Sequence, residues 1–283
     1  MGCPFGVTGI LVLTGCLALV WAVGRSFLEG LGRGYWIRRT EPKPIVGHVL
    51  ATVTHDSTIL VVKNIITIPL SIIEEQQFFD VIKNVSRLRH LNIVTLVGFC
   101  MEHGHHLIVY EYIRSMSLDE ALHCAAYTPL SWGLRLRIAL GVARAFNYMH
   151  SSIVPPVAHS NLKAANVLLD EDLMPRVCDC GLTILRSLAS SPVKLNSRPK
   201  VKWASSRLHD SSTLRQMIDP AITRTISSKS LSHFADIVSM CIQAEQEFRS
   251  HMYEIVESLM SLLQRPSAAD GIEDPLSRSF RSE

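Results

Sequence analysis

A change of pattern near residue 113 most restricts the fold of this chain of 283 residues. Residues 45–112 hold short β-branched runs separated by polar turns, and helical spacing occurs there only in residues 72–88. From residue 117 onward the spacing becomes helical, and residues 131–150 form a long amphipathic stretch. These patterns predict an α+β fold in which a small β-rich lobe carrying one helix precedes a larger lobe of helices.

The expected elements can be placed along the chain. We expect strands at residues 49–53, 59–62, 94–100 and 106–112. We expect helices in the second lobe at residues 118–122, 131–150, 212–217, 231–245 and 251–263. The last segment, residues 266–283, is polar with mixed charge, and its composition is typical of a tail.

The N-terminus carries the most apolar segment of the chain. Residues 3–24 contain no charged side chain, and residues 7–23 are long enough as a helix to cross a bilayer core of about 30 Å. A cleaved signal peptide is the alternative, but its usual positively charged start is missing. Four arginines follow the apolar run, which places everything after residue 24 in the cytoplasm by the positive-inside rule: Arg25, Arg33, Arg38 and Arg39. We therefore predict a single-pass membrane anchor.

Charge and cysteine content exclude other classes of protein. The formal net charge is +3, which is too small to indicate nucleic acid binding. The seven cysteines are scattered and form no pair of C-x-x-C units, so neither a zinc site nor a disulfide framework is predicted. Cys178 and Cys180, which flank Asp179, are interpreted as small buried hydrophobic residues.

Two short motifs in the second lobe carry the chemistry. The first is His159-Ser160-Asn161-Leu162-Lys163-Ala164-Ala165-Asn166, and the second is Asp179-Cys180-Gly181. Further characteristic segments occur in a fixed order along the chain, including residues 85–90, 98–100, 107–112, 162–170, 217–220 and 230–236. In these segments the chain, from about residue 47 to residue 265, resembles plant receptor-like protein kinases, most closely the STRUBBELIG-type leucine-rich-repeat receptor family. The resemblance implies a two-lobed protein-kinase-like fold.

The resemblance also assigns roles in phosphoryl transfer. The catalytic position that accepts the substrate proton in this family is held here by Asn161, whose amide is no base near neutral pH. Lys163 matches the lysine that contacts the transferring phosphate. Asn166 and Asp179 match the two ligands of Mg²⁺. The motif thus retains its metal ligands and lacks its base.

The nucleotide site implied by the resemblance is also altered. Its members would be Gly47, Val61, Lys63, Glu111 and Ile113. The glycine-rich loop that ends at residue 47 has prolines, without N–H groups, in place of its first two glycines: Pro42 and Pro44. The helix glutamate that normally pairs with the strand lysine is replaced by Val81, so the lysine is expected to be unpaired. ATP and Mg²⁺ are therefore doubtful cofactors.

A segment of the family pattern is missing after the second motif. Residues 182–199 lead directly to residues 201–204, which match the family far downstream, so the A-P-E motif and a long central helix are absent from the pattern. The C-terminal lobe is predicted to be incomplete. Arg249 would then lack its usual glutamate partner, and the helices from Leu231 onward would expose an apolar face.

These observations predict five regions and three alternative functions. The regions are a membrane anchor or signal peptide, a basic juxtamembrane linker, a kinase-like N-lobe, a kinase-like C-lobe lacking the A-P-E and central-helix region, and a polar tail: residues 1–24, 25–40, 41–112, 113–265 and 266–283. The first hypothesis is a plasma-membrane pseudokinase that binds other membrane receptor kinases or signalling proteins. The alternatives are a weakly active ATP-dependent Ser/Thr kinase and a non-functional truncated product.

Overall fold

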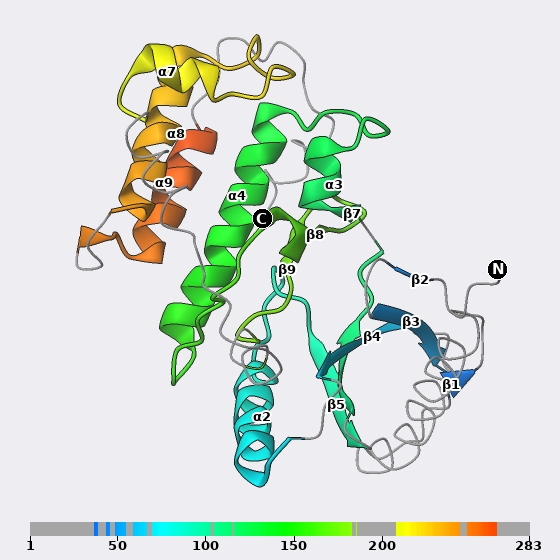
Figure 1. Ribbon diagram of the computed structural model, residues 1–283. Helices are drawn as coiled ribbons and strands as arrows, with labels where there is room; N and C mark the ends of the chain where they lie inside the picture. Colours follow the sequence, from blue (N-terminus) through cyan, green and yellow to red (C-terminus); the bar gives the residue numbers. More distant parts are fainter. Residues whose placement is uncertain are drawn as a thin grey trace, which may run out of the picture.

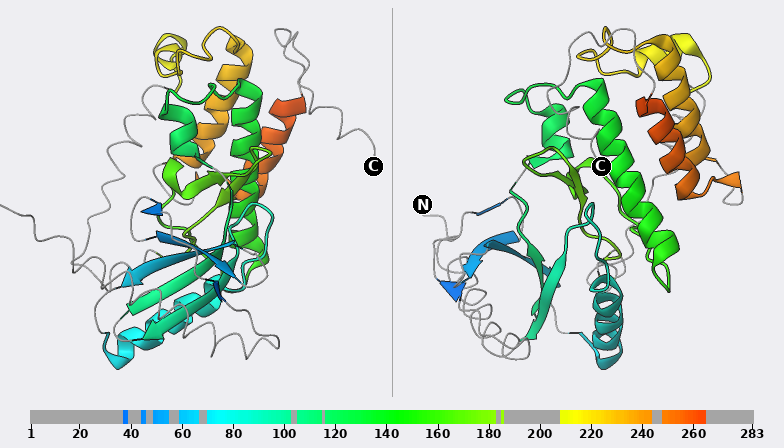
Figure 2. Two further views of the ribbon diagram at one scale, coloured as in Figure 1. Left: turned by 90° about the vertical axis from the view of Figure 1, so that its right-hand side faces the viewer. Right: turned by 180° about the vertical axis from the view of Figure 1, so that it is seen from behind.

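The chain is described by a computed structural model, and the order of its elements agrees with the sequence pattern. A β-rich lobe and a helical lobe lie at opposite ends of the molecule (Figure 1, Figure 2). The structure describes residues 37–38, 44–45, 49–54, 59–66, 70–102, 105–114, 116–182, 185, 208–243 and 248–264. The expected membrane anchor, the linker start and the tail lie outside these residues.

The first lobe is built on an antiparallel sheet of six strands. The strands are β1 (Ile37–Arg38), β2 (Pro44–Ile45), β3 (Val49–Thr54), β4 (Ile59–Ile66), β5 (Leu96–Glu102) and β6 (His105–Glu111). Their order is β1-β3-β4-β6-β5, and β2 also pairs with β3. All four strands expected from the sequence are confirmed, with ends shifted by a few residues because β-branched runs define strand centres better than strand ends.

One helix, α2 (Ile72–Val85), covers the sheet, as the sequence predicted. Ser71 and Glu74 form a reciprocal capping box at its N-terminus. Its buried side chains recur at helical spacing and pack toward the sheet: Phe78, Ile82 and Val85. The helix therefore has one face committed to the core and leaves its opposite face at the surface.

The helical lobe begins with short elements that frame the first motif. They are β7 (Met116–Ser117), α3 (Leu118–His123), α4 (Trp132–Asn147), the π-turn η1 (Tyr148–Ser152), the 3-10 turn η2 (Ala164–Asn166), β8 (Val167–Leu169) and β9 (Pro175–Val177). Strands β7, β8 and β9 form a second, three-stranded sheet. Helix α4 crosses β9 closely at Gly141, where an added Cβ would lie 2.4 Å from Pro175 Cγ.

Three further helices complete the described part of this lobe. They are α7 (Ser211–Gln216), α8 (Ser228–Cys241) and α9 (Met252–Gln264), close to the helices expected from the sequence. The expectation that they would expose an apolar face is wrong. Leu259 and its neighbours on α9 pack against α4 in one buried cluster: Leu136, Leu140, Ala143, Ile237, Ile255, Leu259 and Leu262. Helix α9 thus covers the face of α4.

One hydrophobic cluster spans both lobes. Phe78 and Ile82 of α2 belong to the same buried cluster as Met149, Val157 and Val177 of the helical lobe. Backbone hydrogen bonds reinforce this junction, with Val94 N donating to Val177 O at 3.0 Å and Val177 N donating to Asn92 O at 2.8 Å. The loop before β8 and the turn after β9 are thereby fixed beside the first lobe.

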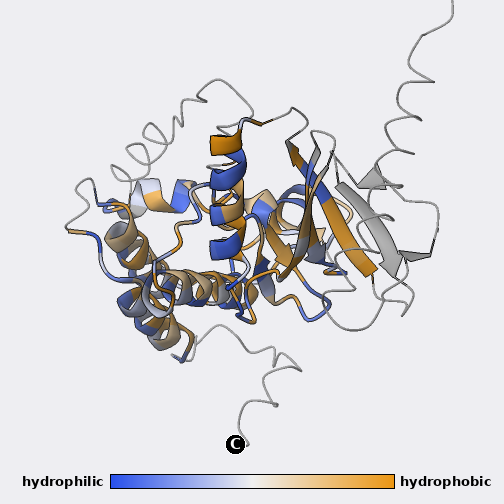
Figure 3. Cartoon of the chain, turned by 90° about the horizontal axis from the view of Figure 1, so that it is seen from below, coloured by the Kyte–Doolittle hydropathy of each residue, from blue (hydrophilic) through white to orange (hydrophobic). Residues whose placement is uncertain are grey.

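The described helices are amphipathic. Hydrophobic and hydrophilic residues alternate along them (Figure 3). Within the described ranges, no helix combines the length and the hydropathy that crossing a membrane requires.

Candidate functional site

The residues expected to act in phosphoryl transfer come from three segments at the junction of the lobes. Strand β4 carries Lys63, which is paired with Ile108 on β6 in the sheet register. The loop between η1 and η2 carries Asn161 and Lys163, and the turn after β9 carries Asp179. A backbone hydrogen bond from Cys178 N to Asn166 O, at 3.0 Å, holds the two motifs side by side.

A close ion pair at the site joins the two lobes. Lys63 Nζ lies 2.5 Å from Asp179 Oδ2, and the carboxylate side chain is only 4% exposed. The expectation of an unpaired Lys63 is therefore wrong. With Val81 on α2 in place of the usual glutamate, the lysine pairs with the aspartate of the second motif, because a partly buried ammonium group requires an anionic partner.

Asp80, the neighbour of Val81 on α2, is bonded within its own helix and does not replace the glutamate expected at residue 81. Asp80 is exposed and accepts a hydrogen bond from Gln76 at 3.2 Å, one turn earlier on α2. Val81 is half-buried and packs against the shared core. One residue along a helix is a rotation of about 100°, so the two adjacent side chains face different environments.

The first motif is held by its own hydrogen bonds. The ring of His159 is buried and stacks on Phe146, with ring centres 5.8 Å apart. Its Nδ1 accepts a hydrogen bond from Asn161 N at 3.3 Å, and Asn166 Nδ2 donates to Asn161 O at 2.9 Å. Lys163 is exposed beside this loop. The loop is thus ordered at the catalytic position while presenting an amide there.

The side chains of Asn166 and Asp179 are of a type that binds Mg²⁺, but a metal ion would have to compete with Lys63 for the carboxylate of Asp179. A carboxylate and an amide oxygen are ligands that Mg²⁺ accepts, usually together with phosphate oxygens. Asn166 uses its Nδ2 for Asn161 O, which leaves its Oδ1 as the acceptor. Asp179 already pairs with Lys63. In the described part of the chain, no three His, Cys, Asp or Glu side chains are grouped closely enough to hold a metal ion.

The segments expected to contact the adenine ring are held by strand pairing and hydrogen bonds. Val61 is half-buried and pairs with Ala51 on β3 and Tyr110 on β6. Glu111 is joined twice to Thr95, since its N–H donates to Thr95 O at 3.1 Å and its carboxylate accepts from Thr95 N at 2.7 Å. Ile113 packs against the shared core. The segment that resembles an adenine-binding hinge is therefore also an ordinary structural connection between the lobes.

The glycine-rich loop is described only at its flanks. Pro44 lies in β2 opposite Leu50, and Ile45 lies opposite Val49 on β3. This register forms a hairpin at the place where the loop was expected. Gly47 and Pro42 lie outside the described residues, so their expected roles stay predictions.

The turn after β9 has a cysteine between Asp179 and Gly181. Cys180 stands there, is 3% exposed, and burial raises the pKa of its thiol to about 12. The prediction of a small buried hydrophobic residue is thus confirmed for Cys180, while Cys178 is half-buried. Gly181 follows with φ of +72°, and a Cβ there would lie 3.1 Å from Val157 Cγ1.

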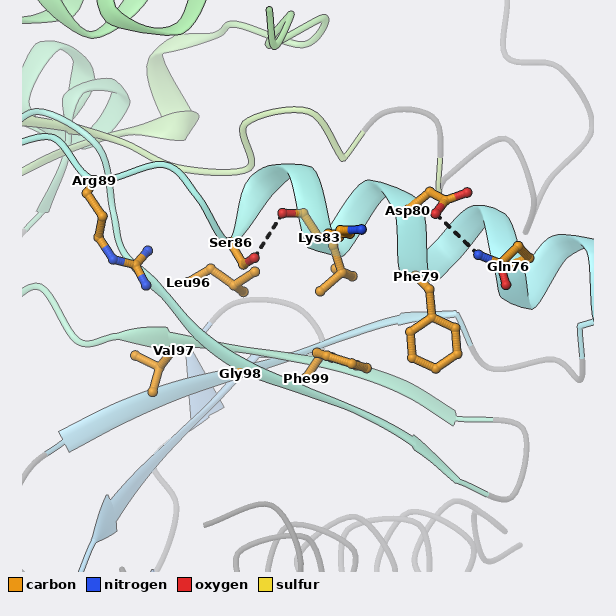
Figure 4. Close-up of a pocket in the computed structure, with 11 residues that line it drawn as sticks. Gln76, Phe79, Asp80, Lys83, Ser86, Arg89, Leu96, Val97, Gly98 and Phe99 are labelled. Carbon is orange, nitrogen blue, oxygen red and sulfur yellow. Dashed lines mark hydrogen bonds between the residues drawn. The ribbon is translucent and has the colours of Figure 1, made fainter. Parts of the chain in front are cut away.

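Arg249, expected to lack its usual glutamate partner, donates from Nε to the backbone oxygen of Gln243 at 2.9 Å. Sequence reasoning missed a hollow between α2 and β5, the last strand in the order of the sheet (Figure 4). Its signal in the sequence is Phe79, an aromatic residue placed off the buried stripe of α2, which includes Phe78 and Ile82.

Comparisons with known proteins identify the class to which this site belongs. A family described as "Protein tyrosine and serine/threonine kinase" matches residues 45–219. This match covers more than half of the chain, and the chain therefore belongs to the protein kinase family.

The chain is also similar to particular plant receptors, which confirms the resemblance drawn from the motifs. It is 46% identical to STRUBBELIG-RECEPTOR FAMILY 2 of Arabidopsis thaliana over 84% of the chain and 40% of that protein. It is 36% identical to STRUBBELIG-RECEPTOR FAMILY 5 of the same plant, again over 84% and 40%. The chain thus spans about 40% of the length of these relatives.

Solved structures with a similar fold include pseudokinases. The pseudokinase domain of BIR2, an immune regulator of the RLK/Pelle family, is 25% identical with a TM-score of 0.60, over 78% of this chain and 79% of that one. The pseudokinase DRIK1, bound to ENMD-2076, is 22% identical with a TM-score of 0.60, over 81% and 92%. The latter likeness concerns the fold alone.

Proposed function

We propose that the chain is a receptor-like kinase homologue that acts in signalling as a pseudokinase, through contacts with other proteins. The observation that carries the proposal is the Lys63–Asp179 ion pair combined with an amide at Asn161. The ion pair joins the lysine expected to bind the nucleotide phosphates to the aspartate expected to bind the metal. The amide of Asn161 stands where an active kinase has its proton acceptor.

The loss of the base weighs directly on the reaction. A positioned general base contributes typically about 10²–10⁴-fold to a rate, and an amide cannot supply that contribution. Asn161 is nevertheless fixed in the loop through its backbone, since its carbonyl oxygen accepts from Asn166 and its N–H donates to His159. The loop thus preserves its shape without its chemistry, which favours a scaffold over an enzyme.

The ion pair weighs on nucleotide binding. ATP with Mg²⁺ would be held by Lys63, Asn166 and Asp179, with Gly47, Val61, Glu111 and Ile113 toward the adenine and Lys163 toward the terminal phosphate. Such binding must first separate Lys63 from Asp179, whose carboxylate is almost fully buried. We therefore expect nucleotide affinity to be weak.

The surroundings of the kinase-like part complete the proposal. Residues 3–24 would anchor the chain in the plasma membrane as a single-pass helix, with the following linker and both lobes in the cytoplasm. The C-lobe would lack the A-P-E and central-helix region, with α9 covering α4 in its place. Its partners would be other membrane receptor kinases or signalling proteins.

Nucleotide binding is tested by thermal unfolding of the full chain in detergent with Mg²⁺ and ATP. Binding to the folded state raises Tm by mass action, so a weak site gives little or no rise at about 1 mM ATP. A clear concentration-dependent rise would contradict weak binding. The variant Lys63→Met serves as the control in which the expected phosphate contact is absent.

Catalysis is tested by restoring the base. We expect Asn161→Asp to show no phosphate transfer to itself or to a generic protein substrate, because Lys63 has no glutamate on α2 and Asp179 remains paired with it. The variant Asn161→Asp/Val81→Glu, which also returns an acid to α2, is the informative comparison. Transfer by the wild-type chain would establish the weakly active kinase instead.

A further inference from the structure

Arginines gather along helix α4, which lies between α9 and β9 (Figure 1, Figure 2). Arg137 and Arg144 are two turns apart on α4 and therefore share one face of the helix. Between them α4 crosses β9 closely, at Gly141 and Pro175, and the next residue of β9 is Arg176. We call Arg137, Arg144 and Arg176 the basic face. None of the three belongs to the site described above.

The guanidinium of Arg144 has no anionic partner in the described part of the chain. It is exposed, and its Nη2 donates to Met260 Sδ on α9 at 3.8 Å, an uncharged and weak acceptor. Arg176 is better balanced, since its Nε lies 3.4 Å from Asp170 Oδ2. The basic face therefore keeps positive charge at the surface that an anion would neutralise.

The ring of His90 lies in the field of this positive charge. It stacks on Tyr148, one turn after Arg144, with ring centres 5.1 Å apart. Burial, followed by the charges of Arg144 and Arg176, lowers the pKa of His90. The two arginines are thus close enough together to act on the same ring, and their combined field favours an anion over a further cation.

The chain that leaves α9 carries the opposite charge. Helix α9 ends at Gln264, and residues 265–283 lie outside the described residues. Residues 266–277 contain no Lys, Arg or His but include three carboxylates: Asp270, Glu273 and Asp274. We call residues 270–274 the acidic segment.

The acidic segment is within reach of the basic face. Met260, which contacts Arg144, is about one turn, roughly 6 Å, before the end of α9. Asp270 comes six residues after Gln264, and six extended residues span about 20 Å. The carboxylates can therefore approach the arginines without any change in α9.

We propose that the acidic segment binds the basic face of the same chain, with its carboxylates beside the guanidinium groups of Arg137, Arg144 and Arg176. The segment would then run along α4 between α9 and β9. It would also cover a surface that otherwise attracts acidic partners. The proposal goes beyond the proposed function, because it concerns a surface outside the phosphoryl-transfer site.

Charge and tethering favour this occupant over others. The linker, residues 25–40, is basic and would be repelled. The acidic segment of a second copy carries the same carboxylates, but it must first be bound from solution. A segment tethered by a short chain is present at an effective concentration of about 1 mM. The contact within one chain therefore forms first at ordinary protein concentrations.

Cleavage of the full chain in detergent by an endoproteinase specific for glutamate tests the contact. Glu273 lies inside the acidic segment, and a bound segment must detach before the protease can cut there. At low salt we expect the chain to be cut at Glu273 about tenfold more slowly than a synthetic peptide of residues 265–283. About 1 M NaCl, where charges are screened within roughly 3 Å, should remove most of that difference. Equal rates for chain and peptide at low salt would overturn the proposal.

Charge reversal locates the contact. Arg144→Glu should speed cleavage at Glu273 about fivefold by replacing an attraction with a repulsion. The matched control is Arg224→Glu, the same change at an exposed residue between α7 and α8, which should leave the rate unchanged. Adding Asp274→Arg to Arg144→Glu should restore slow cleavage, with each chain compared with the peptide of its own sequence. Equal rates for wild type and Arg144→Glu would count decisively against the basic face.

A second variant keeps the test independent of folding. Asp270→Asn/Asp274→Asn leaves every described residue unchanged and should also speed cleavage, again relative to its own peptide. Unfolding midpoints of all variants are measured alongside. An unchanged relative rate in this variant would overturn the proposal even if Arg144→Glu failed to fold.

Protein concentration separates one chain from two. Slow cleavage that is constant from about 0.1 to 10 µM supports a contact within one chain. Protection that appears only as the concentration rises would overturn it in favour of a contact between copies. Neither result depends on nucleotide or on phosphate transfer, so the pseudokinase proposal is tested separately.

Discussion

At the scale of single residues, a lost partner has been replaced across the lobe junction. Val81 stands on α2 where the family resemblance implies a glutamate, and Lys63 pairs instead with Asp179. Asp179 has φ of 62°, a left-handed conformation that aspartate and asparagine tolerate better than other residues with side chains. The site therefore depends on one charged contact between segments far apart in sequence.

Removing one member of this pair should destabilise the protein. Lys63→Met leaves a carboxylate at 4% exposure without its cation, and we expect the free energy of unfolding to fall by about 1–3 kcal/mol. Lys63→Met/Asp179→Asn should recover part of that loss, because asparagine keeps the backbone conformation without a buried charge. Urea unfolding of the three proteins measures both effects. Equal stability of wild type and Lys63→Met would contradict a structural role for the pair.

A second residue predicts how stability depends on pH. The ring of His90 stacks on Tyr148 with centres 5.1 Å apart, and its Nδ1 accepts a hydrogen bond from Asn92 N at 3.0 Å. Burial, followed by the charges of Arg144 and Arg176, lowers the pKa of His90 below 6.5 in the folded state. Burial also lowers the pKa of His150.

The sign follows from proton linkage. Below about pH 6.5 these histidines bind protons in the unfolded chain but remain largely neutral in the folded chain. The free energy of unfolding therefore falls as the pH drops from 6.5 toward the lowered folded-state pKa values. Urea unfolding between pH 7.5 and 5.5 measures this slope, and His90→Gln should reduce it. A flat slope in wild type would show that these histidines titrate as they do in the unfolded chain, and a slope of opposite sign would contradict the lowered pKa values.

At the scale of elements, the crossing of α4 over β9 depends on a glycine. A Cβ at Gly141 would lie 2.4 Å from Pro175 Cγ and 2.9 Å from Asn92 Nδ2. Asn92 is fully buried and donates from that same Nδ2 to Pro175 O at 2.9 Å. The close approach therefore allows a buried hydrogen bond that ties the first lobe to β9.

Two alanine substitutions in the same helix should have opposite effects. Alanine is better than glycine by at most about 1 kcal/mol in a helix, and Gly133, in the first turn of α4, has no atom within 4 Å of an added Cβ. We expect Gly133→Ala to be neutral or stabilising. Gly141→Ala should instead lower stability by about 1–3 kcal/mol, because its neighbours must move. Thermal or urea unfolding compares the pair, and similar shifts for both would argue against the tight crossing.

At the scale of the whole molecule, α9 gives the helical lobe its second layer. Leu259 is 3% exposed within the cluster that joins α9 to α4. Leu259→Ala should lower the free energy of unfolding by about 2–5 kcal/mol, as for other buried leucines. The exposed neighbour Glu257 is the control, and Glu257→Ala should change stability by less than about 0.5 kcal/mol. A small effect of Leu259→Ala would mean that α9 does not complete this lobe.

The features of the fold and of the site that the sequence predicts are those set by residues close together in the chain. Local periodicity was sufficient for β4, α2 and α4, because alternating and helical spacing are set by neighbouring residues. It failed for Lys63, whose partner lies 116 residues away. It also failed for α9, whose apolar face was expected to be left exposed, whereas in the structure that face packs on α4. The bulge at Val97, where the pairing of β5 with β6 shifts, left no periodic signal.

The core shared by the two lobes has a mechanical consequence. Phe78 and Ile82 from one lobe and Met149 and Val177 from the other are buried in one cluster. Close-packed interiors resist compression and transmit strain. A displacement of α2 caused by a partner that binds its exposed face should therefore reach the turn at Asp179. We expect the two lobes to move as one rigid body rather than to open and close about a hinge.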